Sequence, residues 1–337
     1  MIQARGLVQT FHTGRGKKKR EVRAVDGVDL DIAEGEVVGF LGPNGAGKTT
    51  TLRMLTTLLR PTAGQATVNG YDVVREAVQV RRSIGYVSQA GGTFSQAQAG
   101  DEVVDHGMLY GLSRSEATRR GRQLFDQLQL DGLWERMPKN MSGGQKRRLD
   151  IAMGLVHDPT LVFLDEPTTG LDPQARANLW EHIRRLRIEH GATIFLTTHY
   201  LDEADELSDR ILIIDNGRIV AADTADNLKA RVSGDLVDLE LADVTHVGAA
   251  AAKLGSIANA VETQGCHVRG RVPRAGQQVP ALLRELTSAS IELESIEIIR
   301  PTLDDVFLTM TGRSLRDAEA ATESAADAEL ENEGALR

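Results

Sequence analysis

A glycine-rich segment near the N-terminus, GPNGAGKT at positions 42–49, combines residue types that bind phosphate. It fits the pattern G-x-x-x-x-G-K-[ST], which holds the phosphates of a nucleoside triphosphate. Glycines let backbone N–H groups approach an anion closely, and a following helix points its positive end toward it. Lys48 would lie between the β- and γ-phosphates, and Thr49 would offer its hydroxyl to Mg²⁺. The predicted ATP contacts here are Gly42, Pro43, Asn44, Gly45, Ala46, Gly47, Lys48, Thr49 and Thr50.

Two adjacent carboxylates, Asp165 and Glu166, follow the apolar run LVFL at 161–164. In a parallel sheet, ligands lie at the carboxyl ends of the strands, so both acids should face the phosphates once the chain turns there. Asp165 would hold Mg²⁺ through its hydration shell, and Glu166 would polarise the attacking water as a general base. Either acid alone could instead cap the next helix, an alternative that fits the pair poorly.

A third segment, MSGGQKRRLD at 141–150, places a serine where a helix N-cap belongs. Residues 145–155 then read as a helix. Taken alone, this segment is an ordinary capped helix. It becomes specific only beside the two preceding motifs.

In this order the motifs resemble those of the ATP-binding subunit of ABC transporters, over about residues 1–230. The resemblance makes Ser142, Gly143, Gly144 and Gln145 the signature segment that contacts ATP. It implies that Gln89, in YVSQ, joins Mg²⁺ and the attacking water to the membrane-partner interface. His199, in FLTTH, would be the γ-phosphate sensor, and Asp172, in GLD, would cross to the opposite subunit. Met141 stands where the family usually has leucine, a change of little consequence for apolar volume.

An aromatic residue usually stacks on adenine in this family, and Phe11 is the candidate. A phenylalanine buried in the core is the alternative. The segment after it, Gly14–Arg20, has five cations in seven residues and reads as an insertion. We expect a solvated hairpin loop, with a basic loop near anionic lipid or nucleotide phosphate as the alternative.

The elements that must position these residues alternate between strands and helices. Strands that are apolar on both faces are typical of a buried parallel sheet, which predicts an α/β fold. With the resemblance, the fold class is a P-loop NTPase of the ABC type with a helical subdomain. A helix over Lys48–Leu59 should follow the phosphate loop, which argues against a mere glycine turn. The expected strands are Glu36–Leu41, Ser83–Ser88, Thr160–Leu164, Thr193–Thr197 and Arg210–Ile214.

We divide the chain into an ATPase domain at 1–232, with its helical lobe at about 90–155, and an accessory domain at 233–312. The accessory domain reads in the order β-α-β-β-α-β, which predicts a small ferredoxin-like α+β domain. Pro301 should open a short helix after it. Residues 313–337 are acidic, with few large apolar groups, so we expect a disordered tail. The expected elements are Leu236–Leu241, Val247–Leu254, Ala258–Thr263, His267–Val272, Val279–Ser288 and Ile291–Ile299.

Composition is ordinary for a soluble globular protein, so the transport role that the resemblance implies would require separate membrane subunits. The 337 residues are 41 % apolar and 26 % charged, and no apolar run approaches the roughly 20 residues of a spanning helix. The N-terminus lacks the layout of a signal peptide. A net charge of −9 argues against nucleic-acid binding, and the single cysteine, Cys266, indicates a reducing compartment and a small buried side chain.

The chain has one phosphate loop and one signature segment. The resemblance implies that two chains are needed for a complete ATP site, because in this family the signature contacts ATP held by a second subunit. We therefore expect a homodimer with ATP and Mg²⁺ at each interface site, a heterodimer being the alternative. A separate permease would dock near residues 90–112, at the cytoplasmic face of the membrane. The C-terminal PTLDDVFLTMTG at 301–312 resembles the daunorubicin-resistance type, which implies export of a drug, antibiotic or lipid-like compound. The alternative function is a soluble ABC-type ATPase acting on nucleic acid or ribosomes.

Overall fold

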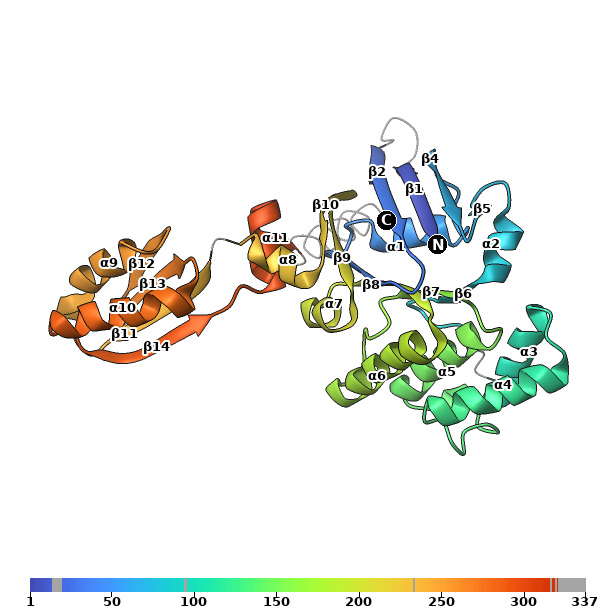
Figure 1. The fold of residues 1–337 in the computed structure, drawn as a ribbon. Helices are drawn as coiled ribbons and strands as arrows, with labels where there is room; N and C mark the ends of the chain where they lie inside the picture. Colours follow the sequence, from blue (N-terminus) through green and yellow to red (C-terminus); the bar gives the residue numbers. More distant parts are fainter. Residues whose placement is uncertain (14–19, 94–95, 233, 316, 319, 321–337) are drawn as a thin grey trace, which may run out of the picture. The chain divides into compact units, whose positions relative to one another are not determined.

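The fold is taken from a computed structural model that describes residues 1–13, 20–93, 96–232, 234–315, 317, 318 and 320. The chain forms two compact units (Figure 1). One comprises Met1–Ala225 with the described residues from Leu315 onward, and the other comprises Asp226–Ser314. The tail expected from residue 313 lies mostly outside the described residues, and within its described part Leu315 and Ala318 are buried.

A six-stranded sheet forms the centre of the first unit, in the order β10-β9-β3-β8-β7-β6. The pairs among β9, β3, β8, β7 and β6 are parallel, and β10 adds an antiparallel edge. The α/β fold class predicted from the sequence is confirmed, and the expected strands agree within one or two residues. The strands are β3 (Val37–Leu41), β6 (Ile84–Val87), β7 (Leu161–Asp165), β8 (Thr193–Thr198), β9 (Arg210–Asp215) and β10 (Arg218–Asp223).

Strands β3, β7 and β8 are buried along their whole length, which explains their near-continuous apolar sequences. Phe195 of β8 packs between Phe40 and Phe163, with ring centroids 5.4 and 5.7 Å away. The register pairs Leu41 with Thr198 and Asp165 with Thr197. The carboxyl ends of the three strands therefore meet at one edge of the sheet.

A second sheet, in the order β2-β1-β4-β5, is a feature that the sequence analysis did not predict. All its neighbouring strands are antiparallel. Side chains from this sheet, such as Ile2 and Val68, share a hydrophobic core with Phe40 and Phe163 of the parallel sheet. Residues 14–19, the centre of the predicted basic loop, lie outside the described residues between β1 and β2. The strands are β1 (Ile2–Thr13), β2 (Arg20–Ile32), β4 (Ala63–Val68) and β5 (Tyr71–Asp72).

A second core forms where helices pack against the opposite side chains of the parallel sheet, including Val162 and Ile194. Helices α3, α4 and α5 gather into the helical lobe that the fold class predicts (Figure 1). The signature helix α5 begins at Gly143, two residues before the expected start, because Ser142 caps it. The helices of this unit are α1 (Lys48–Leu55), α2 (Ala77–Ser83), α3 (Ala99–Leu109), α4 (Arg114–Gln127), α5 (Gly143–Leu155), α6 (Pro173–His190) and α7 (Leu201–Leu207), with the 3₁₀ turn η2 (Pro138–Asn140).

The second unit contains an antiparallel sheet in the order β12-β13-β11-β14, which is the ferredoxin-like arrangement. Side chains of α9 and α10 form a core with one face of this sheet. Its elements are α8 (Ala225–Ala230), β11 (Asp235–Leu241), η3 (Val244–His246), α9 (Val247–Gly255), β12 (Val261–Gln264), β13 (His267–Val272), α10 (Ala275–Ser288), β14 (Leu293–Ile299) and α11 (Leu303–Thr311).

Four local expectations for this unit need correction. Strand β12 begins at Val261 rather than Ala258. Helix α10 begins at Ala275 rather than Val279, so Pro280 lies in its second turn. Helix α11 is capped by Thr302, whose hydroxyl accepts from the backbone of Asp305, so Pro301 precedes the helix instead of opening it. Cys266 is half-buried in the turn between β12 and β13, not fully buried.

Candidate active site

The phosphate loop connects β3 to α1, as the motif predicts. A Cβ on Gly42 would lie 2.3 Å from the Ile214 carbonyl oxygen, and one on Gly47 would lie 2.5 Å from that of Ala24. Gly47 also has a φ of 105°, which favours glycine. These two glycines are thus required by the protein's own packing, besides any approach of phosphate. Helix α1 ends at Leu55 rather than Leu59, since Thr57 adopts a left-handed backbone.

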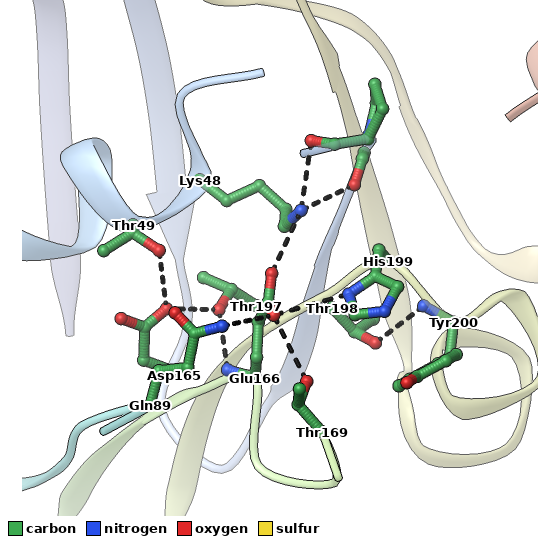
Figure 2. Close-up of polar contacts among 12 residues, drawn as sticks. Lys48, Thr49, Gln89, Asp165, Glu166, Thr169, Thr197, Thr198, His199 and Tyr200 are labelled. Carbon is green, nitrogen blue, oxygen red and sulfur yellow. Dashed lines mark hydrogen bonds and ion pairs between the residues drawn. The ribbon is translucent and has the colours of Figure 1, made fainter. Parts of the chain in front are cut away.

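Lys48 is buried, with 4 % of its surface exposed, and its ammonium lies at the centre of the loop. Nζ donates to the carbonyls of Gly42 (2.7 Å) and Pro43 (3.1 Å), and it lies 3.3 Å from Oε1 of Glu166. A buried cation needs such partners because solvent does not screen it. The lysine is therefore fixed between the loop and the acidic strand end (Figure 2).

Asp165 joins the phosphate loop to two strands. Its Oδ1 accepts from the Thr49 hydroxyl (3.0 Å) and the Thr197 hydroxyl (2.7 Å). A hydroxyl and a carboxylate are hard oxygen ligands, and Mg²⁺ is usually held by one or two such groups together with waters and phosphate oxygens. The described residues contain no cluster of three or more His, Cys, Asp or Glu side chains for a metal. The Thr49–Asp165 pair thus fits Mg²⁺ bound with phosphate.

Glu166 is where most of the predicted catalytic residues meet (Figure 2). Oε2 accepts from Nε2 of Gln89 (2.9 Å) and from the Thr169 hydroxyl (3.2 Å), and it lies 3.4 Å from Nδ1 of His199. Its backbone is left-handed, with a φ of 43°. This turn explains how neighbouring residues at a strand end direct both carboxylates into one site.

The charge state of Glu166 follows from opposing effects. Burial by itself would raise its pKa, but the contact with His199 and the positive charge of Lys48 outweigh burial and lower the pKa to about 2. The carboxylate is therefore ionised at neutral pH. It can accept a hydrogen bond from a water molecule without first losing a proton.

The signature segment and Asp172 have local roles in the single chain. Ser142 and Gln145 form a capping box, with Gln145 N donating to Ser142 Oγ (3.2 Å) and Ser142 N donating to Gln145 Oε1 (2.9 Å). Asp172 caps α6 by accepting from the Ala175 amide (2.9 Å). The helix cap considered for Asp165 or Glu166 is thus supplied by Asp172. The expected contacts of Asp172 and Ser142 with a second subunit stay predictions.

Phe11 lies in β1 opposite Val22, and 38 % of its surface is exposed. The alternative of a core phenylalanine is therefore wrong. Stacking on adenine stays a prediction.

Four contributors to the site were missed in the sequence analysis. Thr197 bridges the two acids, since its hydroxyl donates to Asp165 and accepts from the Glu166 amide (3.0 Å). Thr169 contacts Glu166, and Arg147 and Asp150 of α5 reach the loop that carries Gln89 and the end of β7. The sequence carried no signal for Arg147, because it is the middle residue of the basic run Lys146–Arg148 and only the structure shows that it is the buried one.

Comparisons with known proteins identify the family. Residues 25–169 match the ABC transporter family model, and residues 224–311 match the C-terminal domain of DrrA1-3-like ATP-binding proteins. The daunorubicin resistance ATP-binding protein DrrA3 of Streptomyces coeruleorubidus is 43 % identical, over 94 % of this chain and 100 % of its own length. The chain belongs to the ABC transporter ATP-binding family. It is accordingly an ATP-hydrolysing transport ATPase that binds ATP.

Other relatives of this ABC ATPase agree. The daunorubicin/doxorubicin resistance ATP-binding protein DrrA of Streptomyces peucetius is 41 % identical over 97 % of each chain. Among solved structures, the dimeric post-hydrolysis state of the ATP-binding cassette MJ0796 with ADP and Pi matches with a TM-score of 0.61 and 26 % identity. That match covers 66 % of this chain and 98 % of the other. The nucleic-acid alternative gains no support from these relatives. No helix in the described part of the chain has the length and apolarity to cross a bilayer.

Proposed function

We propose that this chain is the ATP-hydrolysing subunit of an exporter and works as a dimer that closes on two molecules of Mg-ATP. The observation that carries this proposal is the convergence on Glu166 of Lys48, Gln89 and His199, beside the Thr49–Asp165 pair. A phosphate-binding cation, a metal-binding pair and an ionised carboxylate are the parts that phosphoryl transfer to water needs.

Each side chain has a distinct task in this proposal. Lys48 and the loop amides bind the β- and γ-phosphates. Thr49 and Asp165 hold Mg²⁺, which neutralises developing charge on the phosphates. Glu166 orients and polarises the attacking water, and His199 contacts the γ-phosphate. When Lys48 engages phosphate, one of the charges that depress the pKa of Glu166 is shared with the ligand, so the carboxylate becomes a better base.

The signature segment belongs to the other half of the site. Ser142 is the N-cap of α5, so its hydroxyl lies at the positive end of the helix dipole, which suits an anion. We propose that these groups contact the γ-phosphate held by a second copy of the chain, with Asp172 reaching across the same interface. The loss of the γ-phosphate on hydrolysis would remove those contacts and allow the dimer to reopen.

Transport requires a membrane component, which we propose is a separate permease docked near residues 90–112 at the cytoplasmic face. The cargo is proposed to be a drug, antibiotic or lipid-like compound. The names of the relatives, which give daunorubicin and doxorubicin resistance, support export of this class. Phe11 is proposed to stack on the adenine ring.

The test of the proposed function is Glu166→Gln in the full chain. Turnover should fall by about 100-fold or more, because an amide is a poor base. ATP binding should persist, and sizing with Mg-ATP should show an accumulated dimer. Glu206→Gln, which changes an exposed carboxylate of α7 paired with Arg184, is the matched control and should leave turnover unchanged. Near-normal hydrolysis and a monomer for Glu166→Gln would contradict the proposal.

A further inference from the structure

The signature helix α5 carries two charged residues, one buried and one half-buried, that contact the exit of β7 and the loop around Gln89. Arg147 and Asp150 are three residues apart, so they lie on the same face of the helix. Arg147 is 7 % exposed. Such burial of a charged group raises the question of what the guanidinium contacts.

Arg147 donates only to backbone carbonyls in its described hydrogen bonds. Nε donates to Pro167 (2.8 Å), and Nη2 donates to Asp165 (2.9 Å) and Glu166 (3.4 Å). Nη1 donates to the carbonyl of Ser88, the residue directly before Gln89. One planar side chain thus holds the exits of β6 and β7, the two strands that present Gln89 and the acidic pair.

Asp150 holds the same loop from its other end. Its Oδ1 accepts from the backbone N–H of Gly92 (2.8 Å), and the Thr93 amide also hydrogen-bonds its carboxylate. A Cβ on Gly91 would lie 2.9 Å from Asp150 Oδ2, so the loop passes very close to the carboxylate. Two side chains of α5 therefore hold the loop over Ser88–Gly92: Arg147 donates to its first residue, and Asp150 accepts from its last.

These contacts link the signature helix, which is proposed to contact ATP on a second chain, to the residues around Glu166 in the same chain. The N-terminus of α5 is the signature segment, and the loop and strand ends carry residues that contact Glu166 in the same chain. We propose that Arg147 and Asp150 are positioning residues that fix the Gln89 loop to the signature helix, and thereby couple the two ATP sites of the dimer. This inference rests on the proposed dimeric ATPase. Docking of α5 against the second copy's nucleotide would then set the position of Gln89 and the exit of β7.

The next residue of the same helix provides a matched control. Arg148 also donates to backbone carbonyls, namely those of Gly144 (3.3 Å), Leu128 (3.1 Å) and Gln129 (3.3 Å). Leu128 caps α4 and Gln129 follows it, so these bonds stay inside the helical lobe. Arg147→Met and Arg148→Met therefore remove the same chemical group from the same helix, but only the first cuts the link to the sheet.

The experiment measures kcat, the Hill coefficient for ATP and the ATP dissociation constant of the full-length variants. Arg147→Met should lower kcat by about 30-fold, since small misplacements of catalytic groups are costly. Its ATP dissociation constant should stay within about threefold of wild type, because the phosphate loop is intact. The Hill coefficient should fall from its wild-type value to about one. Arg148→Met should keep the Hill coefficient and stay within about threefold of the wild-type kcat.

A conservative variant covers the case in which Arg147→Met does not fold. Arg147→Lys keeps the charge but reaches fewer carbonyls, so its kcat should fall by about fivefold with a reduced Hill coefficient. Equal losses in Arg147→Met and Arg148→Met, or an unchanged Hill coefficient in Arg147→Lys, would overturn the inference. A wild-type chain that hydrolyses ATP with a Hill coefficient of about one would overturn it too. A wild-type chain without ATPase activity would instead contradict the proposed function.

Discussion

Charged side chains gather both at the carboxyl-terminal edge of the parallel sheet and on the face of the C-terminal sheet that lies away from its core. The two groups differ in how deeply the side chains are buried and in whether they converge on one point. At the first, Lys48 and Glu166 are 4 % and 7 % exposed, and their partners converge from separate strands and loops. On the second, Asp238 pairs with His267 (3.1 Å) and Arg269 (2.7 Å) across neighbouring strands. The side chains of His267 and Arg269 are 38 % and 44 % exposed, whereas the side chain of Asp238 between them is 12 % exposed.

The difference teaches where charge indicates chemistry. Cross-strand pairs in which one partner reaches solvent contribute little, because solvent and salt screen that partner's charge. Buried charges are costly to desolvate, so a fold that keeps several of them at one point needs them there. In this molecule, buried charged side chains that converge at the edge of the parallel sheet indicate the active site. The charged row of Asp238, His267 and Arg269 on β11 and β13 instead supports the sheet.

The largest effect that tests this comparison should come from Lys48→Ala. Loss of a buried ammonium beside two phosphates should weaken ATP binding by about 10- to 100-fold, the value of a charge-assisted contact. Lys139→Ala removes an exposed lysine of η2 and is the control, with no expected change. Isothermal titration with Mg-ATP measures both. An unchanged affinity for Lys48→Ala would remove the distinction between buried and exposed charge.

A smaller effect should appear in the free energy of unfolding when the pH is lowered, through a buried histidine of the first unit. His157 is stacked on Tyr110 at 3.8 Å, and burial is the main cause that lowers its pKa to about 4. Because the folded pKa lies below the ordinary 6.5, the unfolded chain takes up the proton first. The free energy of unfolding should therefore fall as pH drops from about 6.5 toward 4, by no more than about 3 kcal/mol.

Denaturant titrations of wild type and His157→Gln across that pH range would measure this contribution. The variant should show a shallower dependence on pH because the titrating ring is gone. Identical slopes for the two proteins would mean that His157 is not the group responsible.

The smallest effect should come from the charged row of the second unit. Burial by itself would raise the pKa of Asp238, but the hydrogen bonds from Arg269 and His267 outweigh burial and lower that pKa. Its stabilisation is thus present above the ordinary value of 3.8 and is lost as pH falls below it. Asp238→Asn should cost less than about 1 kcal/mol at neutral pH and leave ATPase turnover unchanged. A large loss of turnover would show that exposed pairs here carry function after all.

Local patterns predicted the parallel strands and the phosphate loop because each is encoded over a few successive residues. Strand β7 is an apolar run that stops at a charge, and the helix after Ser142 begins at a capping residue. The order of elements in the second unit was also predictable, since turns separate short periodic stretches. The meeting of Glu166 with the phosphate loop followed from the rule that parallel strands present their carboxyl ends together. The place of Gln89 beside them came from the family resemblance.

Contacts between distant segments were not predictable in the same way. Residues of β1 pair with residues of β4 that lie 55 (Val8 and Ala63) to 66 (Ile2 and Val68) positions later, and no local pattern specifies that pairing. Arg147 binds backbone carbonyls, which every residue carries, so its partners leave no trace in the residue types. The exposure of Phe11 depends on whether anything packs over β1, which one strand cannot reveal.

The small side chain of Thr197 contacts both acids at the end of β7. It touches neither lysine nor phosphate loop in its described hydrogen bonds, yet its single hydroxyl binds the side chain of Asp165 and the peptide of Glu166. The left-handed peptide at Glu166 is disfavoured for a residue with a Cβ, so it must be restrained by its neighbours. The two acids that are proposed to hold Mg²⁺ and to orient water consequently share one hydroxyl on the adjacent strand, so its removal would take a contact from both at once.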